Sequence, residues 1–538
     1  MRPAGLLALA AAVLALAGCS AGVERPACPA GKVCLEYGNS YDPTSLDPQK
    51  TSLVAEAVVL GDIMVGLVQD GPDGKPIPGV ARSWETSPDG LTWTFHLRPA
   101  LWSDGTPLTA DDFVFSYRRI MDPKTASPYA YLLYFLKNAQ AVNGGSMAPS
   151  ELGVRALDAH TLQLTLEHPA PYLPQIAKHA SMYPVPRHMV ERWGDAWAAP
   201  GRYVSDGAFR PVSWKLGDHI EVVKNPLFFD AAKVCVDRID YYPTNDAISA
   251  ERRVRRGELD VNTAFQSNRV GYLRGAHGMP AFVHTAPYLA TTYLPFNTHD
   301  VASLKDVRVR QALSMAVDRE FITGKLLRAG QTPAYAFVPP GIANYRSGPH
   351  TLWAAWPLAR RQAAARQLLA AAGYGPARPL EIELKLPNSS DSMLFAPAIQ
   401  ADWRAIGVHA TLVQNEAQIA YDAYKTRDFQ VGVANWVFDF DDPLTFLGLF
   451  QSSTGQQNYS DYSNPAFDAL LARADREPDT ARRADFLAKA EQLVLDDASI
   501  IPVYFSVSRN LVNPRVTGWI DNITDNHRAR FLCMAKTR

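Results

Sequence analysis

The densest acidic cluster in the sequence is the segment DFDDP at 439–443. It lacks the ligand spacing and the glycine of a calcium-binding loop. Asp441 or Asp442 is typical of a helix cap, because the proline that follows is favoured in a first helical turn. Asp439 differs, because it follows the apolar run 435–438, which predicts a buried strand end. A carboxylate placed there needs a partner, and a ligand ammonium is one candidate.

Signatures of catalysis are missing from the sequence. It contains no G-x-S-x-G elbow, no H-E-x-x-H pair, no P-loop and no G-x-G-x-x-G turn. Its 12 histidines are scattered, and none forms a pair with metal-ligand spacing. We therefore expect no enzyme, no metal site and no cofactor.

The amino terminus has the pattern of an export signal. Met1 and Arg2 form a short positive region, and the apolar run 6–17 follows it. That run is shorter than the roughly 20 residues that a membrane-spanning helix needs. It ends in Leu-Ala-Gly before Cys19, which predicts a signal peptide at 1–18 and a lipidated Cys19 at the start of a tether over 19–33. The alternative is an ordinary signal peptide followed by a coincidental cysteine.

Length and composition limit the class of protein. The chain has 538 residues, of which 47% are hydrophobic and 20% are charged. A chain of this length exceeds the size of a single core, so we expect two or three lobes. The net charge of −1 argues against a nucleic-acid partner, which requires a basic surface.

The remaining cysteines have the pattern of an exported protein. If Cys19 carries lipid, an even number is left, which predicts at least one disulfide. These are Cys28, Cys34, Cys235 and Cys533. Three connectivities are open and the count does not choose among them, with four free buried thiols as the alternative.

Helical and strand patterns alternate along the chain and indicate an α/β fold. Alternating apolar residues predict strands at 91–98 and 161–166, with further strands at 380–386 and 408–413. Amphipathic or capped segments predict helices. These helices are expected at 109–119, 306–319, 359–372 and 481–495.

An ordered set of short motifs covers nearly the whole chain from about residue 34. The motifs are SLDP at 45–48, PGVARSW at 78–84, WTFHLR at 93–98, WSDGTP at 102–107, TASPY at 125–129, DVRVRQAL at 306–313 and IPVY at 501–504. In this order and spacing the chain closely resembles the oligopeptide-binding proteins of bacterial peptide ABC importers, within extracellular solute-binding family 5.

The resemblance implies a periplasmic-binding-protein clamshell of type II, or cluster C. It has two large lobes and an additional inserted small lobe. Lobe I is expected at 34–64, 189–290 and 507–538, the inserted lobe II at 65–188, and lobe III at 291–506. All four cysteines after the anchor then fall in or beside lobe I.

The resemblance also implies a binding site between the lobes, where an extended peptide pairs its backbone with a protein strand. Asp439 matches the acid that binds the ligand ammonium. Trp436 is implied as a pocket wall, and Val437 and Val54 as backbone contacts. The implied aromatics are Tyr129 beside the ligand terminus, with Tyr288 and Tyr293 as further pocket residues.

The sequence departs from the family at the carboxylate end of the ligand. Basic positions of the family carry Val433, Met393, Tyr424 and Val301 here, and a pocket tryptophan position carries Ala417. We therefore expect that amidating the carboxyl terminus of a ligand costs little affinity. Nearby cations that could substitute are Lys425, Arg427 and His299.

Two other classes of function stay open beside peptide capture for import. One is a receptor of the same fold for a modified or cell-wall peptide or a non-peptide amine. The other is an enzyme or chaperone on the same scaffold. The expected partners are a peptide, the importer's permease subunits and a membrane held through the lipid anchor. We expect a monomer on the periplasmic or extracytoplasmic side of that membrane.

Overall fold

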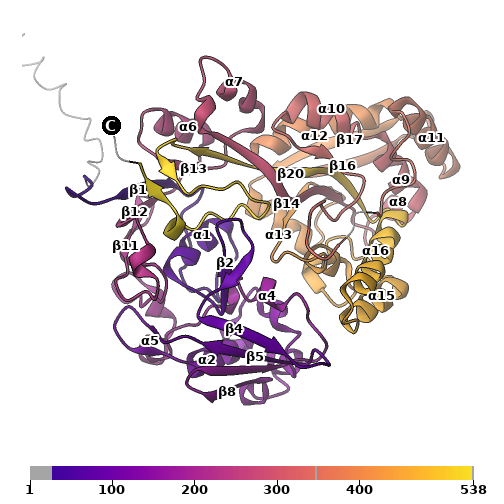
Figure 1. Cartoon of the computed structure of the whole chain (residues 1–538). Helices are drawn as coiled ribbons and strands as arrows, with labels where there is room; N and C mark the ends of the chain where they lie inside the picture. Colours follow the sequence, from indigo (N-terminus) through magenta and orange to yellow (C-terminus); the bar gives the residue numbers. More distant parts are fainter. Residues whose placement is uncertain (1–26, 346–347, 536–538) are drawn as a thin grey trace, which may run out of the picture.

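The structure is a computed structural model that describes residues 27–345 and 348–535. It is an α/β protein with two large lobes and a smaller inserted one (Figure 1). The predicted signal peptide and Cys19 lie outside the described residues. Within the described ranges, the structure contains no helix that is long and apolar enough to span a membrane.

A nine-stranded sheet forms the centre of the molecule. Its strand order is β10-β11-β12-β1-β13-β20-β14-β19, and β15 pairs with β20. Strand β1 is parallel to β12 and β13, whereas the other neighbours are antiparallel. The bounds are β10 Phe209–Lys215, β11 His219–Lys224, β12 Arg238–Tyr242, β1 Cys34–Gly38, β13 Val261–Thr263, β20 Ile500–Val512, β14 Val283–Pro295, β19 Ala434–Val437 and β15 Thr332–Pro333.

Two long strands of this sheet connect the large lobes. Strands β14 and β20 have 13 residues each and pair antiparallel, with an irregular register between Pro287 and Thr291. The expected lobe boundaries at 290/291 and 506/507 fall inside these strands (Figure 1). Paired strands that continue through both boundaries restrict the relative motion of the large lobes to bending or twisting of the two strands.

The inserted lobe is built on a four-stranded antiparallel sheet in the order β4-β5-β9-β8. Helix α2 (Ala110–Met121) packs on it and begins in a capping box, where Asp112 Oδ2 accepts from the Thr109 backbone N–H at 2.8 Å. The strands expected at 91–98 and 161–166 are β5 and β9, so both are confirmed. The other bounds are β4 Ala81–Thr86, β5 Thr92–Leu97, β9 Thr161–Thr165, β8 Val154–Asp158, β2 Val68–Asp70, β3 Pro76–Pro78, β6 Ala100–Leu101, β7 Pro107–Leu108, α3 Ala139–Asn143, α4 Leu173–Ile176 and α5 Arg187–Trp193.

The third lobe contains a parallel sheet in the order β17-β16-β18 with helices around it. The helix expected at 359–372 is α11, which ends before Gly373, a residue with φ of 86°. The helix expected at 306–319 ends earlier, because Asp318 caps a new short helix. The bounds are β16 Leu380–Pro387, β17 Val408–Asn415, β18 Val431–Gly432, α8 Ala302–Lys305, α9 Val307–Ala316, α10 Arg319–Phe321, α11 Leu358–Ala371, α12 Ser390–Ala405, α13 Ala417–Lys425, α14 Leu444–Leu447, α15 Pro465–Asp475 and α16 Thr480–Asp496.

The hydrophobic cores follow this division. One buried cluster joins the first and inserted lobes, and two others fill the third lobe. Phe440 from the third lobe is buried in the first cluster, where its ring stacks on Tyr172 with centroids 5.5 Å apart. The turn that carries the acidic segment therefore connects the third lobe to the inserted lobe.

Two disulfides lie in the first lobe. Cys28 pairs with Cys34 and Cys235 pairs with Cys533, with Cα atoms 5.8 and 5.4 Å apart. This selects one of the three connectivities that the sequence left open. The second bond joins the C-terminal strand pair to the lobe. The remaining elements are α1 Val54–Ile63, α6 Ala247–Arg255, α7 Val270–Arg274, β21 Val516–Thr517 and β22 Cys533–Met534.

Candidate functional site

Strand β19 forms one edge of the central sheet, where it pairs with β14. The Phe438 backbone N–H donates to the Leu289 carbonyl at 3.0 Å, so the backbone N–H of Phe438 points toward β14. Inward and outward backbone groups alternate along an antiparallel strand, so Val437 and Asn435 direct theirs outward. The Asn435 N–H accordingly reaches the Tyr421 hydroxyl at 3.2 Å. Val437 thus lies where an added strand can pair, and its role as a backbone contact to a ligand stays a prediction.

Asp439 stands just beyond this edge. Its Oδ2 accepts a hydrogen bond from the Tyr131 hydroxyl at 3.1 Å, and its backbone N–H donates to Thr445 Oγ1 at 2.8 Å. Burial raises the pKa of Asp439 to about 7, and the hydroxyl contacts oppose that rise only in part. No basic side chain pairs with this carboxylate in the described part of the chain. An incoming ammonium would supply the missing charge.

Aromatic residues of the inserted lobe close over Asp439. The rings of Tyr129 and Tyr131 lie 5.9 Å apart, and Tyr129 meets His179 edge-on at 4.8 Å. Burial, with the charge of Asp439, raises the pKa of both tyrosines. Burial lowers the pKa of His179 to about 4, so its imidazole is neutral and does not compete as a cation. Sequence reasoning identified Tyr129 and missed Tyr131, although it stands two positions later.

Val54 belongs to the first lobe. It is the first residue of helix α1 and is 60% exposed. The buried Glu56 carboxylate fixes this turn by accepting from the backbone N–H groups of Ser52 and Leu53, each at 2.9 Å. The charge of Glu56 also contributes to the raised pKa of Tyr129. Tyr129 therefore lies near Glu56 of the first lobe as well as Asp439 of the third lobe, and a contact of Val54 with a ligand stays a prediction.

The remaining predicted aromatics have different surroundings. Trp436 is half-buried, and its Nε1 has no hydrogen-bond partner among the residues that the structure describes. The half-buried Tyr288 ring lies edge-on to Phe438 with centroids 6.2 Å apart. Tyr293 is only 3% exposed and packs on Phe337 in the core of the third lobe. Trp436 and Tyr288 thus border the site turn, whereas Tyr293 lies beneath it.

A cavity of about 270 Å³ extends along β19 on the side away from Asp439. It opens between the end of β16, helix α13 and strand β20. Nine of its 16 lining residues carry a hydroxyl or an amide, and two, Asp391 and Arg509, carry opposite charges. The lining residues are Thr292, Gln331, Pro387, Ser389, Ser390, Asp391, Ser392, Ala417, Tyr421, Val433, Ala434, Asn435, Tyr504, Ser506, Val507 and Arg509.

One of the four replaced basic positions, Val433, lines this cavity, and so does Ala417, which stands at the replaced tryptophan position. Tyr424 is fully buried, and its hydroxyl lies 3.0 and 3.1 Å from the carbonyl oxygens of Lys385 and Val433, either of which can accept its single O–H, so Tyr424 has a structural role. Met393 is partly exposed and Val301 half-buried.

The nearby cations named as substitutes have other partners. Lys425 lies 3.5 Å from Asp422, Arg427 pairs with Asp461, and His299 Nδ1 lies 2.6 Å from Asp300. None of the three lines the cavity.

The two other acids of the segment are structural. Asp441 Oδ1 accepts from the Ala343 backbone N–H at 2.7 Å. Asp442 Oδ1 accepts from the Leu444 N–H at 3.1 Å, and both of its oxygens bind Arg483. The N-cap residue of α14 is Pro443, so the expected cap at Asp441 or Asp442 is wrong, although Asp442 contacts the first N–H of the helix.

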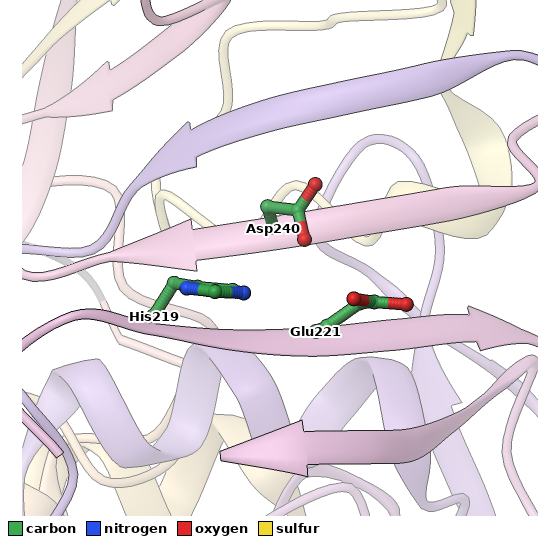
Figure 2. Close-up of side chains that lie close together, drawn as sticks. All are labelled: His219, Glu221 and Asp240. Carbon is green, nitrogen blue, oxygen red and sulfur yellow. The ribbon is translucent and has the colours of Figure 1, made fainter. Parts of the chain in front are cut away.

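One group of possible metal ligands lies elsewhere, on β11 and β12 (Figure 2). One donor atom from each of His219, Glu221 and Asp240 falls within 4.8 Å of the others. However, Arg238 Nε lies 2.9 Å from Asp240 Oδ2, so a cation already occupies that side of the carboxylate. We make no metal assignment here.

Fold and site together define an α/β protein of several lobes with a candidate binding site along strand β19. The family described as "Bacterial extracellular solute-binding proteins, family 5 Middle" matches residues 75–458. The chain belongs to this family. Its members are transport receptors, so the protein is a binding protein and not an enzyme.

Named relatives extend over nearly the full chain. The periplasmic oligopeptide-binding protein OppA of Salmonella typhimurium is 36% identical over 534 residues, covering 97% of this chain and 96% of its own. The structure of the Escherichia coli murein tripeptide binding protein MppA has a TM-score of 0.87 at 36% identity, covering 94% and 99%. Haemophilus influenzae OppA in complex with RPPGFSPFR has a TM-score of 0.85 at 33% identity, covering 94% and 99%.

Proposed function

We propose that this protein captures peptides outside the cytoplasm and delivers them to an ABC importer. The observation that carries the proposal is Asp439, a carboxylate without a basic partner in the described residues, beside the outward backbone groups of Val437. Asp439 can bind an ammonium, and the free strand edge at Val437 can pair with an extended backbone. A terminal ammonium and a backbone are the two parts that every peptide shares. The oligopeptide-binding proteins to which the chain is similar support the same function.

The direct test is to identify what the protein carries. Native mass spectrometry of protein purified from its own cell envelope should reveal peptides that are released on unfolding. A carried ligand without a primary amine, together with no binding of any peptide from a mixed pool, would contradict the proposal.

A second candidate function is a receptor for a modified or cell-wall peptide or for a non-peptide amine. The replaced basic positions favour it, and so does the likeness to a murein tripeptide binding protein. The same mass-spectrometry experiment separates the two, because cell-wall peptides carry residues that ribosomal peptides lack.

We further propose a lipid anchor at Cys19 and a monomer that docks on the permease subunits. The support for the anchor is the sequence pattern alone. Cys19→Ala should accumulate unprocessed precursor, and normal cleavage to a protein that leaves the membrane would overturn the anchor.

We propose that the lobes close on the ligand by bending of β14 and β20. The lobes are those expected from the sequence: lobe I at 34–64, 189–290 and 507–538, lobe II at 65–188, and lobe III at 291–506. Small-angle scattering should show a smaller radius of gyration with saturating peptide. An unchanged radius would contradict the closing motion.

A further inference from the structure

The cavity beside β19 contains an ion pair in a polar network. Arg509 Nη1, from β20, lies 2.9 Å from Asp391 Oδ2 and also contacts Ser267 Oγ. The Ser267 hydroxyl donates to the same Oδ2 at 2.8 Å, and Gln331 Nε2 donates to Ser267 Oγ at 2.9 Å. The Arg509 guanidinium is therefore held in place from one side.

The other side of Arg509 is available. Its hydrogen bonds within residues 27–345 and 348–535 all use Nη1, so Nε and Nη2 keep three N–H groups without a protein acceptor there. The side chain lines the cavity and is 20% exposed. A planar fork of free N–H donors is the group that binds a carboxylate best.

Tyr421 stands in the same cavity and limits the length of a ligand. Its hydroxyl accepts the outward N–H of Asn435, so it ends the free edge of β19 at that residue. Burial raises the pKa of Tyr421, which keeps its O–H available as a donor. Asn435 lies four positions before Asp439, about 13 Å for an extended chain. A peptide of about three to four residues spans that distance.

We propose that Arg509, assisted by Tyr421, binds the C-terminal carboxylate of a peptide of three to four residues whose ammonium lies at Asp439. This rests on the proposed function and names its substrate class. It replaces the expectation that the ligand carboxylate has no anchor. The sequence pattern did not select Arg509, because it lies on the last long strand, 118 residues from its partner Asp391.

Asp391 has a distinct role in this arrangement. Its negative charge offsets part of the Arg509 charge and so weakens the attraction for a second carboxylate. It does not cap α12, because Ser389 Oγ accepts from the Ser392 N–H at 3.2 Å. Asp391→Asn should therefore strengthen binding of a free carboxylate, whereas a purely structural ion pair predicts a loss.

The experiment uses mixed-sequence pools of tripeptides and tetrapeptides, each made as free acids and as C-terminal amides. Binding to the purified full-length protein is measured by native mass spectrometry. The wild type should prefer acids by about tenfold or more. Arg509→Gln should reduce that preference to near unity, and Asp391→Asn should increase it. The control Arg427→Gln, a cation paired with Asp461 outside the cavity, should leave it unchanged.

The outcomes separate the two proposals. Equal binding of acids and amides by the wild type, or an unchanged preference in a folded Arg509→Gln variant, overturns the role of Arg509 while peptide capture stands. If Arg427→Gln loses the preference for free acids, Arg427 binds the carboxylate, and the proposed role of Arg509 is likewise overturned. Failure of every pool to bind the wild type overturns peptide capture itself.

Discussion

The hydroxyl of Tyr131 donates to Asp439 Oδ2 at 3.1 Å, and 308 residues separate the two in the chain. The hydrogen bond crosses from the inserted lobe to the third lobe. A neutral hydroxyl stabilises a buried carboxylate less than a cation does. The pair therefore keeps the acid in place and leaves its charge uncompensated until a ligand binds.

Peptide affinity should depend on pH around neutrality. Ammonium binding requires ionised Asp439, whose pKa burial raises to about 7. Affinity should fall about tenfold per pH unit below that value, and again above about 8 as the peptide amine loses its proton. Calorimetry from pH 5 to 9 measures this. Asp439→Asn should remove the acid limb, and an acid limb that persists in this variant would assign it to another group.

Tyr131→Phe provides a finer version of the same test. Because the Tyr131 hydroxyl lowers the pKa of Asp439, its loss should move the acid limb to higher pH, by about one unit for a bond of ordinary strength. The unfolding free energy of the ligand-free protein also depends on pH through Asp439. Because the pKa of Asp439 is raised in the folded state, this group contributes stability at pH values below its pKa in the unfolded chain. That contribution is lost as the pH rises through about 7.

The turn that carries Asp439 should depend on a buried ion pair. Arg483 Nη1 and Nη2 lie 2.7 and 2.8 Å from the oxygens of Asp442, and both side chains are buried. Arg483→Met leaves a buried carboxylate unpaired, which typically costs about 3–5 kcal/mol of unfolding free energy. Arg482→Met breaks only an exposed pair with Glu477 and should cost less than about 1 kcal/mol. Denaturant unfolding of both variants measures this, and equal losses would contradict it.

The two disulfides should differ in their contribution to stability. Cys235 and Cys533 are 298 residues apart, whereas Cys28 and Cys34 are 6 apart. Chain entropy predicts up to about 5 kcal/mol for the long loop and about 2 kcal/mol for the short one. Non-reducing peptide mapping should find these two pairs. Replacing Cys235 and Cys533 by serine should then lower Tm more than replacing the short pair, and the reverse order would be inconsistent with this account.

Local patterns predicted much of this molecule, and long-range packing accounts for the rest. The strand at 91–98 and the helix at 359–372 follow from periodicity and a terminal glycine, because those signals are local. Asp439 could be selected because a carboxylate after an apolar strand is unusual in any context. Arg509 and Tyr131 could not be, because their roles arise only when distant segments meet. Tyr293 is the opposite case, an aromatic in a matching position whose side chain packs into the core.

One calorimetric comparison tests directly whether Asp439 binds the ammonium of a peptide. A peptide that binds the wild type should lose about 30-fold or more in affinity on N-acetylation, because the desolvated charge pair is lost. Asp439→Asn should bind the free peptide as weakly and show little further effect of acetylation, while Asp441→Asn, which removes a charge bound to the Ala343 N–H, should behave as wild type. Acetylation without effect on the wild type would show that the ligand is held by another end or is not a peptide.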